Sequence, residues 1–458
     1  MKRLLSIGIV SLLPLPLLQA QLSPAISSWL QNTSQTGSYY ASGNSSAISN
    51  NILVNCQKVE YSANFVYVTA TGVPSYPTGP FLDGNPSNAS NQNGIYKLPL
   101  NPQPQLGSLQ STVGGNIGIF INGVALFDYR DGVGWNSITN TLCGGPGNPP
   151  CPGGPMATTA WSRDAIPAEK GGFDCSKGHP ANGNYHHHQN PSSFKLDLNV
   201  VSTICNLYDA DGLYTLDSNS HSPLIGFAYD GYPIYGAYGY KNADGTGGIA
   251  RIKSSYELRN ISNRTHWADG TDVNDGPAVS ATYFLGYFRE DYAFISHPND
   301  ADYLDEHNGR FCVTPEYPNG TYAYFATVDE DWNSTYPYVV GPTFYGVYAD
   351  RKVTSVNETT TTYSSGIGIE DNKAWKGTFT VFPNPTSDLI AIQFNGLISS
   401  EVELSLYSLE GQLIESKTVH AGSTLAYFDL QKVYDGMYVL ECKSANWKES
   451  RRIILKRE

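Results

Sequence analysis

Two similar stretches that begin 108 residues apart restrict the fold of this chain more than any other feature of its sequence. IGIFINGVALFDYRDG begins at Ile117, and IGFAYDGYPIYGAYG begins at Ile225. Each contains two short apolar runs around Asn-Gly or Asp-Gly, which is a strong signal for a β-hairpin with a tight turn. Each stretch therefore predicts a hairpin, and their likeness suggests two copies of one β-rich unit.

The likeness continues downstream of each hairpin. The residues that recur in the same order are Asp174, Gly178, Pro180, Gly183 and Tyr185 in the first copy and Asp305, Gly309, Pro318, Gly320 and Tyr322 in the second. The offset between the copies grows along the chain, as loop insertions would explain. We therefore expect a body over residues 51–350 with an internal repeat, about 51–200 and 201–350, around a pseudo-twofold axis. Chance similarity of short motifs is the alternative.

The composition favours strands over helices. Glycine (45), proline (28) and tyrosine (32) are abundant, whereas charged residues make up only 15% of the chain. Such a composition is typical of short strands joined by ordered loops. The sequence therefore predicts a mainly β fold with long loops rich in glycine, asparagine and proline.

The first 20 residues have the features of a secretory signal peptide. Lys2 and Arg3 precede an apolar run that is too short to span a bilayer, and the small residue Ala20 precedes the expected cleavage point. No later stretch approaches the roughly 20 apolar residues of a membrane helix. We therefore expect an exported mature chain without a transmembrane segment, in which the polar residues 21–50 form a flexible lead-in.

The cysteine content fits export. Seven cysteines in an exported chain predict disulfides and leave at least one thiol unpaired. Cys143 and Cys151 flank the turn-rich segment GGPGNPP and are candidates for a local bridge. The other five cysteines cannot be paired from the sequence.

The end of the chain predicts a separate domain. Residues 351–378 are rich in threonine and serine and predict a linker. Residues 379–458 contain short alternating strands with turn signals, which predict a small Ig-like β-sandwich. Its motifs FPNPTSD, LYSLEGQLI, DGMYVLE and the terminal ILKR resemble the C-terminal sorting domain of the type IX secretion pathway. The resemblance implies that the type IX machinery is a partner and that the protein is extracellular or on the outer-membrane surface.

Three consecutive histidines in GHPANGNYHHHQNP are the candidate metal ligands. On a strand, side chains alternate between faces, so His186 and His188 point one way while Tyr185 and His187 point the other. Two imidazoles on one face can converge on one ion, and imidazole suits zinc and copper. Without a visible third ligand of clear zinc spacing, copper is slightly favoured. Histidines that only form hydrogen bonds in a polar loop are the alternative.

The matching stretch of the second copy, YAYF, keeps the aromatic positions and replaces both candidate ligands with Ala323 and Phe325. The joint replacement suggests that His186 and His188 act as a unit and that the second copy is no independent metal site. His179, His221 and His307 are further candidate ligands, the last two through a site shared between the copies.

These blocks also resemble a known family. WSRDAIPAEKGGFDCSKGHPANGNYHHHQNP, HSPLIGFAYDGYPIYG and LDEHNGRFCVTPEYPNGTYAYFATVD are similar to successive blocks of YHYH-domain proteins, named for a Tyr-His-Tyr-His motif. In this chain, His187 occupies the second tyrosine position of the motif. The resemblance covers most of residues 51–350. It implies a role in metal binding and assigns no activity, so whether the ion is catalytic stays open.

Other chemistries have weaker signals. Aspartates in YDADGLYTLD and DGTDVNDGP are hard ligands suited to calcium, although Asp-Gly is also a turn signal. The tyrosines of YDGYPIYGAYGY would suit a non-enzymatic module that binds surface polysaccharide, although cross-strand packing explains their spacing better. A metal-dependent extracellular enzyme is a further alternative. The net charge of −13 disfavours nucleic acid as a partner.

Overall fold

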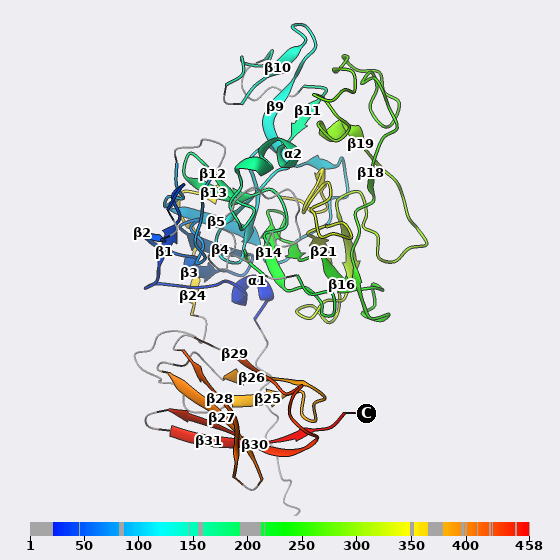
Figure 1. Ribbon diagram of the computed structural model, residues 1–458. Coiled ribbons are helices and arrows are strands. Elements are labelled where there is room, and N and C mark those ends of the chain that lie inside the picture. The colour runs from blue at the N-terminus through cyan, green and yellow to red at the C-terminus, as the bar shows by residue number, and fades with distance from the viewer. Residues whose placement is uncertain are drawn as a thin grey trace, which may run out of the picture. The chain divides into compact units, whose positions relative to one another are not determined.

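The computed structural model of the chain has two compact units, Met1–Tyr363 and Ser364–Glu458 (Figure 1). It describes residues 22–457 except 45, 82–86, 146, 154–158, 193–211, 215, 349–351, 365–378, 395–397, 399–400, 410, 421–422, 424 and 445–446. The predicted signal peptide, residues 1–20, lies outside the described residues. The fold is mainly β, as the composition predicts.

An eight-stranded sheet forms the centre of the first unit, with the spatial order β12-β13-β8-β7-β14-β15-β21-β20. Its strands are β7 (Asn116–Phe120), β8 (Ala125–Phe127), β12 (His179–Ala181), β13 (Asn184–His187), β14 (Leu224–Ala228), β15 (Pro233–Tyr235), β20 (Gly309–Cys312) and β21 (Thr321–Phe325). The middle strands β7 and β14 are antiparallel neighbours. From this pair outward, each half continues through a hairpin partner, a parallel strand and an antiparallel edge strand.

The two halves of this sheet also agree in register. Gly118 pairs with Leu126 in the first predicted hairpin, and Gly226 pairs with Ile234, 108 residues later, in the second. Leu126 and Ile234 then face His187 and Tyr324 on the parallel strands. His187 and Tyr324 therefore occupy equivalent positions in the two halves.

The Ile-Gly pair shared by the two hairpins has a packing reason. A Cβ atom on Gly118 would lie 2.8 Å from the carbonyl oxygen of Phe227, and one on Gly226 would lie 2.7 Å from that of Ile119. Real Cβ atoms do not approach backbone oxygen so closely. Glycine thus lets β7 and β14 meet at the centre of the sheet.

A five-stranded sheet, in the order β23-β5-β4-β3-β24, extends the first unit beyond the limits expected for the body. Its strands are β3 (Cys56–Tyr61), β4 (Phe65–Ala70), β5 (Gly94–Pro99), β23 (Lys352–Val353) and β24 (Thr361–Tyr363). The last two strands come from the segment predicted as a linker. Its threonines pair with a neighbouring strand, for which β-branched residues are suited.

The start of the mature chain is likewise part of the first unit. Instead of a flexible lead-in, residues 22–53 contain α1 (Pro24–Ser27), β1 (Thr36–Tyr39) and β2 (Ile48–Leu53). Trp29 is buried in the main core with Ala25 and Ile26. Backbone hydrogen bonds, such as that from Leu30 N to Ile121 O, join the stretch to the rest of the unit as well.

Smaller elements complete the first unit. They are β6 (Gln110–Ser111), β9 (Arg130–Asn136), β10 (Thr141–Cys143), β11 (Ser162–Asp164), β16 (Tyr238–Tyr240), β17 (Ile249–Arg251), β18 (Tyr256–Leu258), β19 (Tyr292–Phe294), β22 (Thr343–Phe344), α2 (Ala165–Glu169), η1 (Lys170–Gly172) and η2 (Arg289–Asp291). The predicted bridge between Cys143 and Cys151 is present. Cys175 is disulfide-bonded as well, whereas Cys56, Cys312 and Cys442 are buried thiols.

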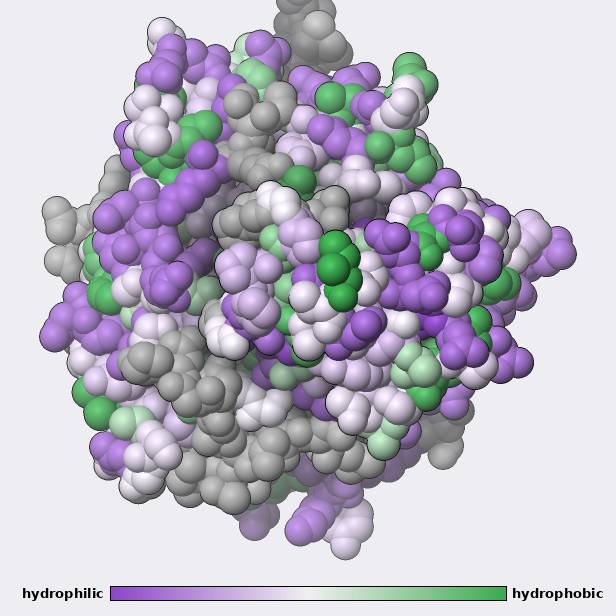
Figure 2. All heavy atoms as spheres, turned by 90° about the horizontal axis from the view of Figure 1, so that it is seen from above, coloured by the Kyte–Doolittle hydropathy of each residue, from purple (hydrophilic) through white to green (hydrophobic). Residues whose placement is uncertain are grey.

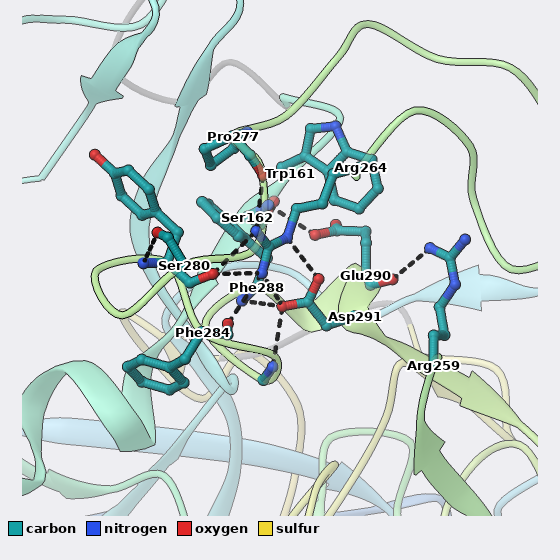
Figure 3. A network of polar contacts seen from close by, with 12 residues as sticks. Trp161, Ser162, Arg259, Arg264, Pro277, Ser280, Phe284, Phe288, Glu290 and Asp291 are labelled. Carbon is teal, nitrogen blue, oxygen red and sulfur yellow. Dashed lines mark hydrogen bonds and ion pairs between the residues drawn. The ribbon is translucent and has the colours of Figure 1, made fainter. Parts of the chain in front are cut away.

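A buried guanidinium organises the long loop between β18 and β19 (Figure 3). Arg264 Nε and Nη2 each donate to one carboxylate oxygen of Asp291, at 2.7 Å, and neither side chain is exposed. The remaining N–H groups of Arg264 donate to the carbonyl oxygens of Pro277, Tyr283 and Phe284. All five donors are used, so this buried charge is fully compensated.

The second unit is a sandwich of two antiparallel sheets, ordered β25-β26-β29 and β28-β27-β30-β31. Its strands are β25 (Phe379–Phe382), β26 (Leu389–Phe394), β27 (Val402–Ser408), β28 (Leu413–Val419), β29 (Leu425–Asp429), β30 (Gly436–Ser444) and β31 (Trp447–Leu455). Along β29, exposed and buried residues alternate strictly, as the sequence pattern predicts. Ile390, Leu404 and Leu440 lie in its core. Within the described parts of both units, no helix has the length and apolar character needed to cross a membrane.

Asp230 gives the first unit a testable pH dependence. Its buried carboxylate accepts hydrogen bonds from Tyr324 Oη at 2.6 Å and Gly346 N at 2.9 Å, yet burial raises its pKa to about 6. A raised pKa means that its contribution to stability is complete below pH 4 and is lost as the pH rises through 6. The shift of about 2 units corresponds to about 3 kcal/mol. We therefore expect the destabilisation caused by Asp230→Asn to shrink by that amount between pH 4 and pH 7.

Urea unfolding of the wild type and the variant across this pH range measures the difference. Asp275→Asn, at an exposed position, is the control and should give a difference that does not change with pH. A parallel pH profile for the wild type and Asp230→Asn would contradict the expectation.

Candidate metal centre

The hairpin of β12 and β13 gathers three histidines on one face of the sheet. His179 lies directly opposite His186 in the antiparallel register, and His188 follows two residues later. Because side chains alternate along a strand, all three project on the same side. One ligand nitrogen from each lies within 4.8 Å of the other two. The structure thus brings together three of the five histidines that the sequence suggests as ligands.

Hydrogen bonds to the backbone fix the ring orientation of two of these histidines. His186 Nδ1 lies 2.8 Å from the carbonyl oxygen of Asn184, and His188 Nδ1 lies 2.6 Å from that of Asp128. A carbonyl oxygen only accepts, so each Nδ1 carries the hydrogen and each Nε2 presents a lone pair. The two Nε2 atoms are 3.1 Å apart. This backbone support is the arrangement that orients histidine ligands in metal proteins.

The surroundings keep His186 in its neutral form. Burial lowers the pKa of its imidazole well below the usual range, and the neighbouring His188 and His179 lower it further. Neutral imidazole is the form that binds a metal ion. Aromatic rings pack against the cluster: the ring centroids of Phe127 and His186 are 3.7 Å apart in a stacked arrangement, and those of Phe173 and His179 are 4.9 Å apart in an edge-to-face arrangement.

Glu169 is a member of this site that the sequence reasoning missed. It is the last residue of α2, and its Oε2 atom lies 3.2 Å from both His179 Nε2 and His188 Nε2. Burial raises the pKa of the Glu169 carboxyl, but its interactions with the neighbouring His179 and His188 outweigh burial, so the pKa lies below its usual range. A lone glutamate ten residues before the first histidine gives no recognisable ligand spacing, and only the path of the loop brings it here.

His187 belongs to the opposite face, as strand alternation predicts. Its Nε2 lies 2.9 Å from Tyr76 Oη, and its Nδ1 lies 3.0 Å from the carbonyl oxygen of Lys177. Beside it, Tyr185 donates to Asp174. The three consecutive histidines are therefore two members of the cluster and one buried member of a separate hydrogen-bond network.

His221 and His307 do not join the cluster. His221 Nδ1 bonds to the carbonyl oxygen of Ser222, and its ring packs against Tyr235 and Tyr240. His307 Nδ1 bonds to Thr343 Oγ1 at 2.6 Å. They lie in the segments before β14 and β20 of the second half, and the centre forms on the outer edge of the first half, away from the boundary between the halves. The structure therefore groups His179, His186 and His188 within the first copy, and it does not bring His221 and His307 into a site shared between the copies.

The second half carries different residues at the positions of the histidine cluster. Arg310 faces Ala323 across β20 and β21, where His179 faces His186 in the first half. Phe325 takes the place of His188. Ala323 and Phe325 offer no metal ligand, as the sequence comparison predicts.

The signals for other ligands do not converge in the described residues. The side chains of Asp217 and Asp269 accept backbone N–H groups within their own turns, and Asp209 and Asp211 lie outside the described residues. The tyrosines of YDGYPIYGAYGY are packed inside rather than displayed. Those that are buried are Tyr229, Tyr232, Tyr235 and Tyr238. Among the members of these two segments that the structure describes, neither a calcium cluster nor a sugar-stacking surface is formed.

The comparison with known families agrees with this geometry. The sequence model of the YHYH protein family matches residues 95–338, which is more than half of the chain and includes all four residues of the centre. The chain belongs to the YHYH protein family. In this YHYH protein, residues 380–456 also match the secretion system C-terminal sorting domain. None of the curated proteins matches the chain.

The sorting domain accounts for the second unit of this YHYH protein. It marks the chain for export to the cell surface or the extracellular space and implies the type IX machinery as a partner. The four motifs that suggest this domain in the sequence all lie within, or at the edge of, the matched segment.

Proposed function

We propose that this exported YHYH protein binds one divalent transition metal ion, zinc or copper, through His179, His186 and His188. One observation carries the proposal. Hydrogen bonds from Nδ1 to backbone carbonyls orient His186 and His188 so that their Nε2 atoms lie 3.1 Å apart. Two Nε2 atoms so close together gain little from one another when each presents a lone pair. A bound cation would satisfy both.

We further propose that the two halves of the eight-stranded sheet are copies of one unit and that only the first copy keeps the metal site. The equal strand order and the equal register of the two hairpins support this interpretation. On this interpretation, the second copy has lost the whole metal site. It carries Arg310, Ala323 and Phe325 at the positions of His179, His186 and His188.

The competing function, recognition of surface polysaccharide, has less support. The tyrosine run that suggested it is mostly buried. On the face shown in Figure 2, hydrophobic residues are scattered among hydrophilic and neutral ones and form no continuous patch. Carbohydrate-stacking sites need accessible aromatic rings, and four of the five tyrosines of this run are buried.

Metal content of the full mature chain tests the proposal. We expect about one equivalent of zinc or copper after loading and dialysis, and loss of most of it in His186→Ala/His188→Ala, because the variant lacks two of the three imidazoles. His266→Ala/His420→Ala removes two exposed histidines and is the matched control, which should keep the wild-type content. Less than a third of an equivalent in the wild type, unchanged in the His186→Ala/His188→Ala variant, would refute metal binding.

A further inference from the structure

We propose that Glu169 supplies the fourth ligand and that the ion is a tetrahedral, zinc-type structural link that ties α2 to the edge hairpin β12–β13. This inference rests on the proposed metal binding and adds its coordination and its role. Glu169 comes from α2, whereas the three histidines come from the β12–β13 hairpin and the residue after it. Coordination by its carboxylate therefore decides whether the ion joins α2 to the hairpin.

The distances between the donor atoms favour a tetrahedral ion. The two imidazole Nε2 atoms are 3.1 Å apart, and Glu169 Oε2 lies 3.2 Å from the Nε2 atoms of His179 and His188. With bonds of about 2.0 Å, two ligands of a tetrahedral ion lie about 3.3 Å apart, whereas neighbouring ligands of a square-planar ion lie about 2.8 Å apart. These three spacings are closer to the tetrahedral value, and the remaining distances among the three histidine donors are at most 4.8 Å. Three nitrogens and one carboxylate oxygen in this geometry suit zinc better than the tetragonal copper(II) ion.

The burial of the donors favours a structural role. The side chains of His179 and His188 are 8% and 3% exposed, and the rings of Phe127 and Phe173 pack against the imidazoles. The Glu169 side chain is 25% exposed, but its Oε2 atom, the proposed donor, is buried. A catalytic metal keeps one coordination position open for water or substrate, whereas a structural ion is enclosed by four protein ligands. Four protein donors in a site lined by aromatic rings match the second class.

The position of the centre in the fold explains what such a link would hold. β12 is the edge strand of the eight-stranded sheet, and it pairs with β13 over only three residues. α2 has five residues, too few for independent stability, and Glu169 is its last. An ion between them would fasten a short helix and a short edge strand to each other.

The second half of the sheet has a cation in the equivalent place. Arg310 lies on the other edge strand, β20, at the position of His179, and its guanidinium lies over the ring of Phe325. It donates to the carbonyl oxygens of Tyr240, Lys241 and Ala301 and so ties β20 to two neighbouring segments. The two edges thus carry different groups at equivalent positions. A guanidinium provides a cross-link on one edge, and the bound ion would provide one on the other.

Cobalt(II) is the probe that tests this coordination, because its visible absorption is intense when it has four ligands and weak when it has six. We expect the wild-type chain loaded with cobalt to show the intense spectrum. Glu169→Gln should weaken cobalt and zinc binding at least about 10-fold and reduce the intensity, while keeping the size of the side chain. Glu330→Gln, at an exposed position, is the matched control and should behave as the wild type.

Hydrogen exchange of the full chain tests the link itself. We expect removal of zinc by a chelator to increase exchange in α2 and β12 of the wild type and to leave β20, which Arg310 holds, unchanged. A weak six-coordinate spectrum in the wild type, or wild-type metal affinity in Glu169→Gln together with unchanged exchange in α2, would overturn the inference while leaving metal binding intact. Failure of the wild-type chain to bind either cobalt or zinc would instead refute the proposed function.

Discussion

Replacing Arg264 with leucine is expected to lower the free energy of unfolding of the first unit by about 3–5 kcal/mol. Leucine leaves the carboxylate of Asp291 buried without the counter-charge with which it pairs in Figure 3, since neither side chain is exposed. It also deprives the carbonyl oxygens of Pro277, Tyr283 and Phe284 of their donor. Urea unfolding followed by tryptophan fluorescence measures the loss.

Two further variants locate the cause. Arg264→Lys keeps the charge but lacks the planar fork, so we expect an intermediate loss. Glu330→Gln breaks the pair of this exposed carboxylate with Arg251 at 3.6 Å, and its effect should stay below about 1 kcal/mol. Equal effects of Arg264→Leu and Glu330→Gln would show that the buried network adds nothing beyond a surface ion pair.

The sequence predicts the parts of this fold that local patterns determine. The turn signals after Ile117 and Ile225 correctly locate the two central hairpins, because Asn-Gly and Asp-Gly fix a tight turn regardless of the surroundings. Strand alternation likewise separates His187 from His186 and His188. The β-sandwich of the second unit follows from the same periodicity.

Contacts between distant segments could not be predicted in this way. Glu169 meets the histidines only because α2 and η1 turn the chain back toward β12, and nothing in its local sequence marks that path. The polar residues 22–53 are held by a few apolar side chains such as Trp29, which low periodicity hides. The repeat in the sequence predicts that His221 and His307 join the site at the interface between the copies. The cluster instead forms within one hairpin at the edge of the sheet, which the repeat does not indicate.

Replacing Asp174 with alanine is expected to cost at least about 4 kcal/mol and to abolish metal binding by the first unit. The carboxylate of Asp174 accepts hydrogen bonds from Gly79 N, Ser176 N, Gly178 N and Tyr185 Oη, and it is completely buried. Each buried donor that loses its acceptor costs about 1–3 kcal/mol. Because Asp174 shapes the turn that leads directly into His179, its removal should also displace a metal ligand.

Comparison with Asp305→Ala distinguishes the effect of Asp174→Ala on stability from its effect on metal binding. It is the counterpart of Asp174 in the second half, and it accepts hydrogen bonds from His307 N, Gly309 N and Tyr322 Oη. Asp305→Ala should therefore destabilise the first unit to a similar degree, yet the folded variant should bind zinc with wild-type affinity, since no proposed ligand adjoins this turn. Urea unfolding and zinc titration of both variants measure the two effects. Equal loss of zinc affinity in Asp174→Ala and Asp305→Ala would mean that the centre depends on the stability of the whole sheet rather than on the turn that carries His179.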